Sequence, residues 1–524
     1  MTHPMSIALI RSPRALAALL MCASLAAPAW AADSEIERVR ATTTRLINLL
    51  VEQGLLTRAR AEALLRELDP PPSTAPAAAP STAPAAATAA QAAPATVRVP
   101  YVPEFVRKEI KDELRTELAA QAAREGWAGP GVVPAWVRGL RWEGDLRSRV
   151  QADNFDAANG PAISVLDTNR TRALALQNST TDRQRLRVRA RLGVNVTADE
   201  NWGGNVRLST GSATDPLSSN QTLGTYGNRF TAAFDRAFVR YRSGSFNAVA
   251  GRFGNPWQGT DLVWANDLGF DGVAAQWTPT LGTWGRATLT AAAMPVQEVE
   301  LSSADKWLYG LQAGVEWPGR GLVSGRVALA YYHYANLTGR ANGAGSSLND
   351  FTAPAFAQKG NTYFNISSDP ARPLLALASD YHLVNLNGSV DMLTVGYKHL
   401  VLSADYVRNI GFKREAVAAR LGQDVQAQTS GYQLRASLGD EALDAAHKWQ
   451  VFFAYKHVER DAVPDAFTDS DLRGGGTDTK GYTLGGSYGL GKNTALSVRW
   501  LSGDAISGAP LSLDTLQIDL LLRF

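Results

Sequence analysis

The stretch Asp182–Asn195, which reads DRQRLRVRARLGVN, decides the fold of this 524-residue chain. Arginine occupies every second position, and apolar residues occupy most of the positions between. Successive side chains of a β-strand point to opposite faces, so this spacing predicts a strand with one apolar face and one guanidinium face. A soluble sheet buries such an apolar face, whereas a transmembrane barrel turns it toward lipid and its polar face toward a watery lumen. The arginines are Arg183, Arg185, Arg187, Arg189 and Arg191.

Segments with the same alternation recur from residue 139 to the C-terminus and decide between the two alternatives. There are about sixteen of them, within the even-numbered range of bacterial outer-membrane barrels. The links between them alternate between short and long, as periplasmic turns and extracellular loops do in such barrels. A soluble sandwich has no reason to keep this alternation over so many hairpins. The sequence therefore predicts an all-β fold, a transmembrane antiparallel β-barrel over residues 139–524.

The residues before the barrel predict a small α-helical periplasmic N-terminal region. Residues 1–31 have the basic, apolar and small-residue parts of a secretory signal peptide. Residues 32–69 have the apolar stripes of a helical hairpin, and residues 70–98 form a Pro/Ala-rich segment that predicts an extended linker. Residues 99–138 predict a periplasmic helix and a connector, because apolar residues recur every four positions from Val106 onward.

The composition excludes several classes of protein. The formal net charge of +3 leaves no basic excess for binding nucleic acid. After the signal peptide, no apolar run is long enough to form a membrane-spanning helix. The one cysteine, Cys22, lies within the signal peptide, so we expect the exported chain to use no disulfides.

Several motifs resemble those of the putative porin family of Gram-negative bacterial outer membranes. The resemblance covers most of residues 99–524 and implies an outer-membrane pore. It implies neither the solute that passes nor any catalytic residue. The motifs are Asp182–Gly193, Ser219–Gly224, Asp235–Tyr241, Gly251–Trp257, Thr260–Leu262, Phe270–Ala274 and Leu402–Asn409, with Val99–Glu104 in the helical part.

Arginine dominates the polar faces of the first five predicted strands. Because arginine stays charged and is weakly hydrated for a cation, a wall of it attracts anions and lowers their barrier to entry. Some of these arginines would instead pair with acids on adjacent strands and serve only the structure. The predicted pore-lining residues are Arg147, Arg149, Arg183, Arg185, Arg187, Arg189, Arg191, Arg207, Arg236, Arg240 and Arg252.

The third long link, which follows Phe253, is predicted to narrow the pore. In general diffusion porins, the loop at this position folds into the barrel. We expect Asp261 and Asp267 to project toward the arginine wall and set a transverse field, although both could equally cap a loop turn. Trp257 and Trp264 complete the predicted constriction loop, and both also fit the aromatic girdles that barrels place at the membrane interfaces.

No catalytic motif occurs in the sequence. It contains neither a G-x-S-x-G elbow nor an H-E-x-x-H pair. The loop acids Asp465, Asp469 and Asp471 have a spacing that fits no known calcium loop. We therefore expect no enzyme activity, no cofactor and no metal site.

The sequence favours an outer-membrane porin through which small hydrophilic solutes diffuse passively, with an anion preference set by the arginine-lined lumen. One alternative is a solute-specific channel with a binding site at the constriction. Another is an envelope-tethering protein whose N-terminal region contacts peptidoglycan while the barrel is the anchor. The expected partners are outer-membrane lipid, small hydrophilic solutes or anions, the barrel-assembly machinery through Phe524, other copies of the chain in a homotrimer, and peptidoglycan.

Overall fold

A computed structural model describes residues 111–113, 116–117, 137, 139–300, 302–319 and 323–524. Residues 111–113 and 116–117 are helical. The predicted signal peptide, helical hairpin and linker, and most of the predicted periplasmic helix and connector, lie outside the described residues. In the described part of the chain, no helix is both long and apolar enough to cross a bilayer.

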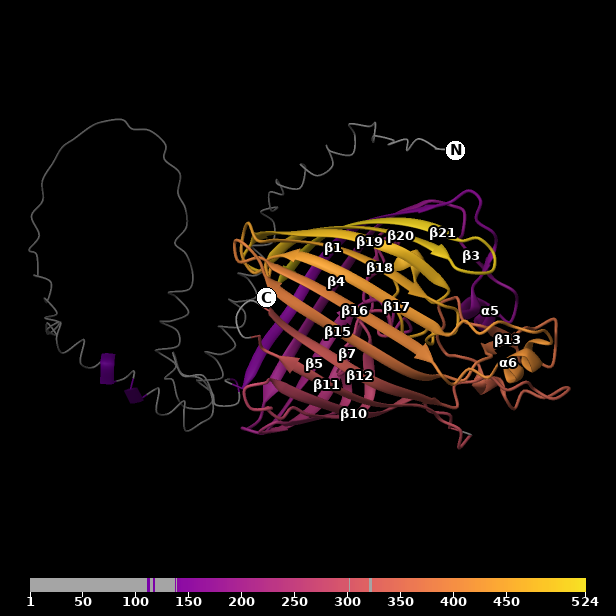
Figure 1. Cartoon of the computed structure of the whole chain (residues 1–524), viewed down its shortest axis with the longest axis horizontal. Coiled ribbons are helices and arrows are strands. Elements are labelled where there is room, and N and C mark those ends of the chain that lie inside the picture. Colours follow the sequence, from indigo (N-terminus) through magenta and orange to yellow (C-terminus); the bar gives the residue numbers. More distant parts are fainter. Residues whose placement is uncertain (1–110, 114–115, 118–136, 138, 301, 320–322) are drawn as a thin grey trace, which may run out of the picture. The chain divides into compact units, whose positions relative to one another are not determined.

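Within the described residues, sixteen long antiparallel strands form a closed barrel, which confirms the predicted architecture (Figure 1). Each strand pairs with its neighbours in chain order, and β1 pairs with the last strand. The strands are β1 (Leu140–Phe155), β4 (Arg183–Thr197), β5 (Trp202–Thr210), β7 (Ala232–Ser243), β8 (Phe246–Gly254), β9 (Gly269–Trp277), β10 (Arg286–Gln297), β11 (Lys306–Trp317), β12 (Val323–Ala335), β15 (His382–Leu393), β16 (His399–Asn409), β17 (Ser430–Gly439), β18 (Trp449–Val458), β19 (Thr479–Gly491), β20 (Thr494–Ala505) and β21 (Ser512–Arg523).

The long links lie at one end of the barrel and carry short elements of their own, including α5, α6 and β13 (Figure 1). Five of these links are named L2 (residues 211–231), L3 (255–268), L5 (336–381), L6 (410–429) and L7 (459–478). Their elements, with those of the first link, are β2 (Ala162–Ile163), α5 (Val165–Thr171), β3 (Leu176–Gln177), β6 (Gln221–Thr222), η2 (Asp350–Thr352), β13 (Tyr363–Asn365), β14 (Leu375–Leu377), α6 (Arg414–Leu421) and η3 (Leu472–Gly474).

The two ends of the barrel sequence meet in one hydrogen-bonded pair of strands. In the β1–β21 register, Arg149 lies opposite Asp519. Gly144 and Phe524 exchange backbone hydrogen bonds of 3.0 and 3.1 Å. The Phe524 ring lies over Gly144, in space that a side chain at residue 144 would occupy. Glycine therefore makes room for the C-terminal ring at the seam of the barrel.

The alternation along the strands sorts side chains between two environments. On β1, Leu146 and Val150 are 46% and 50% exposed on the outer face, while Arg149 between them is 2% exposed. On β4, Leu186 and Leu192 are exposed outward in the same way. An apolar outer face suits lipid, and the polar residues between these positions face the lumen.

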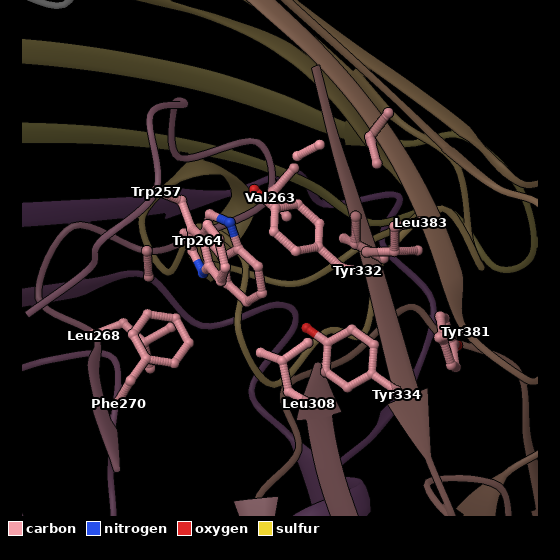
Figure 2. Close-up of a cluster of buried hydrophobic side chains, with 14 of the residues drawn as sticks. Trp257, Val263, Trp264, Leu268, Phe270, Leu308, Tyr332, Tyr334, Tyr381 and Leu383 are labelled. Carbon is pink, nitrogen blue, oxygen red and sulfur yellow. The ribbon is translucent and has the colours of Figure 1, made fainter. Parts of the chain in front are cut away.

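The lumen contains a protein core of its own (Figure 2). Leu308 of β11 and Tyr332 of β12 point inward and are 1% and 0% exposed. They contact a buried apolar cluster that includes Trp264 and Leu268 of L3 and Val463 of L7. One side of the barrel is therefore filled by packed loops, whereas the side formed by β1, β4 and β5 carries the arginines.

Candidate functional site

L3 crosses the interior of the barrel and is fixed to strands on the far side. The side chain of Gln312 on β11 exchanges hydrogen bonds of 2.8 and 2.7 Å with the backbone of Gln258. Asn387 on β15 donates a 3.0 Å bond to the same backbone oxygen. The Asp405 carboxylate on β16 accepts bonds from the Thr260 amide and hydroxyl. These contacts hold L3 inside the barrel, where the sequence analysis predicted it.

Asp267, at the end of L3, contacts the arginine wall of β4. Its carboxylate lies 3.2 Å from Arg189 and 3.3 Å from Arg191, and it accepts a 2.8 Å hydrogen bond from the Ser219 hydroxyl. Burial alone would raise the pKa of Asp267, but the two guanidinium groups hold it below its ordinary value. Asp145 on β1 binds the same two arginines from the other side, at 2.7 and 2.6 Å.

Asp261 differs from the prediction, because it points away from the arginine wall. Its carboxylate lies 3.1 Å from Nζ of Lys456 on β18, and Lys456 also binds Asp469 of L7 at 2.8 Å. The Asp261 backbone oxygen accepts a 3.2 Å bond from the Asp469 amide. L3 is thus anchored by a lysine that the sequence analysis did not select, in a site completed by L7.

The tryptophans of L3 also differ from one expectation, since neither belongs to an aromatic girdle. Trp257 and Trp264 are 6% and 2% exposed, and both contact Tyr332 edge-on, at centroid distances of 5.2 and 5.0 Å (Figure 2). Gly310 on β11 leaves the space in which the Trp257 ring lies. Their role is to pack L3 against the β11–β12 wall.

Several predicted pore-lining arginines are held by acids on neighbouring strands. Asp519 binds Arg149 through two bonds of 2.6 and 2.8 Å. Asp153 on β1 pairs with Arg185. Asp235 accepts three bonds of 2.7 to 3.1 Å from Arg207. These pairs serve the structural role that the sequence analysis left open for part of the arginine set.

Arg147 and Arg187 face the same lumen without such a partner. Among the described residues, no carboxylate lies within ion-pair distance of either guanidinium. Arg147 donates to the Asn220 side chain, and Arg187 donates weakly to Gln151 and Ser218 at 3.3 and 3.4 Å. The Nε atoms of both are buried and make no hydrogen bond within the described part of the chain. Arg183, Arg236 and Arg240 likewise have no carboxylate within ion-pair distance in the described residues.

Arg252 was predicted to face the lumen, but the strand register places it on the outer face of β8. It lies opposite Asp271 on β9 and donates a 2.8 Å bond to that carboxylate, which is 54% exposed. The alternate residues Phe253 and Phe270 point inward and are 2% and 5% exposed. The interior of the barrel is apolar at this point. Arg252 and Asp271 therefore lie on the outer face, and Phe253 and Phe270 lie on the inner face.

Sequence reasoning missed the charged groups on the wall formed by β17, β18 and β20. Arg499 binds Asp471 of L7 at 3.0 Å, and Asp471 also lies 3.7 Å from Arg149 on β1. Burial would raise the pKa of Asp471, but Arg499 and Arg149 hold it well below its ordinary value. Arg435 stacks over the Phe452 ring at 3.8 Å. Strand parity would have found both arginines, since each alternates with apolar residues, whereas nothing local indicates that Asp471 lies between two walls.

A polar chamber of about 330 Å³ lies beside the arginine row. Arg183, Arg185 and Arg187 line it from β4, and Lys359 of L5 lines it as well. Asp215 of L2 also borders the chamber, but its carboxylate accepts a 3.0 Å bond from the Leu217 amide. The chamber therefore brings together basic side chains from a strand and a loop that are far apart in the sequence.

Two loop groups in this region have pKa values near neutrality. Burial, together with repulsion from Arg473, lowers the pKa of Lys359 to about 7, and Asp153 offsets only part of this. Burial raises the pKa of Asp465 in L7 to about 7, although the Tyr363 hydroxyl donates to its carboxylate at 2.9 Å. The positive charge of Lys359 is therefore present below this pH and lost above it, and the negative charge of Asp465 appears above it.

Lowering the pH should consequently strengthen any preference of the lumen for anions. We expect the permeability ratio of chloride to potassium to be higher at about pH 6 than at about pH 8, since both groups shift the lumen toward positive charge as the pH falls. Reversal potentials at the two pH values measure this. The variants Lys359→Met and Asp465→Asn should therefore each reduce the pH dependence, and an unchanged dependence in both would contradict this assignment.

The chain is similar to several solved structures. OprB of Pseudomonas putida is 13% identical with a TM-score of 0.45, and the match covers 74% of this chain and 95% of that one. DcaP of Acinetobacter baumannii is 12% identical with a TM-score of 0.40, covering 74% and 97%. OmpF of Salmonella typhi, in a complex with daunomycin, is 8% identical with a TM-score of 0.40, covering 74% and 99%. No curated protein matches the chain.

The family profile described as "Putative porin" matches residues 40–524. This span includes the complete barrel, the arginine wall and the loops that fill the lumen. The chain belongs to the putative porin family, and it is a β-barrel channel protein of the outer membrane.

Proposed function

We propose that the barrel lets small hydrophilic solutes diffuse passively across the outer membrane and prefers anions. The observation that carries the proposal is the excess of guanidinium groups over carboxylates on the arginine wall of β1 and β4. Asp145 and Asp267 each serve both Arg189 and Arg191, while Arg147 and Arg187 have no carboxylate within ion-pair distance in the described residues. A charge that is not neutralised locally contributes most to the potential that a passing ion meets.

The arrangement of the loops supports a pathway along this wall. L3 and L7 pack against the apolar inner face of β11 and β12, so the remaining polar space lies beside β1 and β4. An anion there passes guanidinium groups that are weakly hydrated and exchange ligands readily. Passive conduction needs such weak, repeated sites, because a single tight site would hold the ion.

The direct test is the reversal potential of the purified mature protein in a planar bilayer under a potassium chloride gradient. We expect single-channel openings, with a reversal potential whose sign shows that chloride is more permeant than potassium. A reversal potential that shows cation selectivity would agree with a channel but refute the proposed role of the arginines. A folded barrel that never conducts would refute the diffusion pathway as well.

A solute-specific channel is the second candidate, and the chamber beside Arg187 favours it. The chamber is lined by four basic groups from β4 and L5, by amide side chains such as Gln151 and Gln358, and by three carboxylates, so basic groups outnumber acids there. Such a set can bind one anionic solute by charge and by hydrogen bonds. Saturable block of the chloride current by a single solute would distinguish this channel from a general pore.

Each of the other expected partners, namely other copies of the chain, the barrel-assembly machinery and peptidoglycan, is a prediction with a test of its own. A homotrimer predicts a cross-linked species of three chains in native membranes. Recognition of Phe524 by the barrel-assembly machinery predicts that removing this residue lowers the amount of inserted barrel. An envelope tether through the N-terminal region predicts that deleting residues 32–96 weakens the envelope, while single-channel conductance stays unchanged.

A further inference from the structure

Two histidines face each other across the β12–β15 pair, at the end of the barrel that bears the long links. His333 and His382 lie directly opposite in the strand register, and their ring centroids are 4.4 Å apart. His333 alternates with Tyr332 and Tyr334, which point inward and are 0% and 4% exposed (Figure 2). The two imidazoles therefore lie on the outer face, where both are half-buried. No sequence motif indicates the pair, because L5 separates the two residues.

The ring nitrogen of His382 has more neighbours than one imidazole atom can serve. The Tyr331 hydroxyl lies 2.9 Å from His382 Nδ1, and His333 Nδ1 lies 3.3 Å from the same atom. An imidazole nitrogen carries either one proton or one lone pair in the plane of its ring. It therefore makes one well-directed hydrogen bond, and the second neighbour is left without one. A cation between the two rings would accept both nitrogen lone pairs at once.

The separation of the two nitrogen atoms fits a tetrahedral metal ion. Zinc binds imidazole nitrogen at about 2.0–2.1 Å with tetrahedral angles, which places two ligand nitrogens about 3.3–3.4 Å apart. The two Nδ1 atoms have this spacing. We propose that His333 and His382 bind zinc through their Nδ1 atoms. Among the described residues, no third histidine, cysteine or carboxylate completes a metal-binding group, so water takes the remaining positions.

The surroundings hold the His382 ring in place before an ion arrives. The His382 carbonyl accepts a 2.8 Å bond from the Ile410 amide. Gly411 of L6 leaves the space in which the ring lies, since a methyl group there would come within 2.5 Å of Cδ2. The charged loop groups that act on the ring are Asp380 and Lys413, which lie 4.0 Å apart and offset each other. Such a ring loses little freedom on binding, and no net loop charge repels a cation.

The zinc ion would join the two ends of L5. His333 lies just before L5, and His382 is the first residue of β15 after it. L5 in turn holds L7, because Gln358 donates a 2.6 Å bond to the Asp465 backbone oxygen, and Asn361 donates to two further L7 carbonyl groups at 2.6 and 2.9 Å. A cross-link between the ends of a long loop reduces the freedom that the loop gains on opening. Zinc thus acts as a clasp on L5 and, through it, on L7.

The test measures zinc binding by the protein purified from outer membranes without a histidine tag. A fluorescent zinc indicator competes for the ion at about pH 7.5, where imidazole is mostly neutral. The site variant is His333→Gln/His382→Gln. The matched control, His447→Gln/His457→Gln, removes two histidines that lie apart, one in the turn before β18 and one opposite Lys480. Far-ultraviolet circular dichroism shows that each barrel is folded.

We expect wild type and control to bind a single zinc ion per chain with equal affinity, and the site variant to lose it. The loss should exceed the about 10- to 100-fold that follows removal of a residue that only hydrogen-bonds a metal ligand, since both ligands are gone. Equal binding by the site variant and the control would overturn the proposal. Displacement of the zinc by excess magnesium would overturn the imidazole ligands, because magnesium prefers oxygen.

A second measurement tests the clasp. We expect added zinc to slow proteolytic cleavage within L5 in wild type and control, and to have no effect on cleavage in the site variant. Zinc that binds at the two histidines without slowing this cleavage would overturn the clasp. Neither measurement depends on conduction, so a failure of the proposed channel function leaves both results interpretable.

Discussion

Neutralising Arg147 and Arg187 together should lower the permeability ratio of chloride to potassium by about fivefold, which corresponds to about 1 kcal/mol at the position of a passing ion. The effect is large because, within the described residues, neither guanidinium has a carboxylate at ion-pair distance to cancel its field. The two residues also lie diagonally across the β1–β4 register, opposite Arg189 and Arg149, so one ion meets both. Reversal potentials of Arg147→Gln/Arg187→Gln measure the change.

The matched control removes two basic residues that face outward. Arg408 on β16 and Lys480 on β19 are both exposed and alternate with the buried residues Val407 and Thr479, and Arg408→Gln/Lys480→Gln changes the net charge of the protein by the same amount. We expect its reversal potential to equal that of the wild type. If the outer pair shifts selectivity as far as the inner pair does, the total charge of the protein governs permeation and the arginine row does not.

Replacing Lys456 with methionine should release L3 and L7 from their positions in the lumen. Lys456 is 7% exposed and binds Asp261 and Asp469. Without it, two carboxylates remain close together with no cation between them, which costs about 3 kcal/mol when a buried ion pair loses one partner. The strands do not depend on this contact, so the barrel stays closed while the loops move. We expect a higher single-channel conductance and proteolytic cleavage within L3.

A charge-matched rescue separates this electrostatic role from simple packing. The variant Lys456→Met/Asp261→Asn/Asp469→Asn removes the lysine and both acids, so no carboxylate is left unpaired at this point. We expect wild-type conductance and protease resistance to return in large part. Conductance equal to that of Lys456→Met alone would show that the lysine side chain acts by filling space, and the ion-pair explanation would be wrong.

The strands were predictable because the two sides of a barrel wall differ sharply in polarity. Leu186 meets lipid and Arg187 meets water, so the alternation is written directly into the sequence of β4. The same contrast in polarity predicted that Asp267 points inward, because a carboxylate in a neighbouring loop is stabilised by the positive charge of the arginine wall. Where the interior is watery, polarity alone assigns the face.

The predictions failed where protein fills the interior. Phe253 takes the inward position that Arg252 was expected to hold, because L3 makes this part of the lumen apolar. Trp257 and Trp264 are buried for the same reason. The partner of Asp261 was also out of reach, since Lys456 lies on β18, far along the sequence, and a contact of this range leaves no periodic signal. A single sequence shows which face is polar, but not which loops meet.

The seam between β1 and β21 sets the order in which the molecule can form. Arg149 and Asp519 are 370 positions apart in the sequence, yet they make a two-bond contact that closes the wall. Contacts of such long range form slowly, because the entropy of bringing distant segments together must be overcome first. Until the final strand arrives, the first strand has an unpaired edge that can join another chain. A chain released before its last dozen residues are made would therefore expose two open edges, and we expect it to aggregate or be degraded instead of entering the membrane.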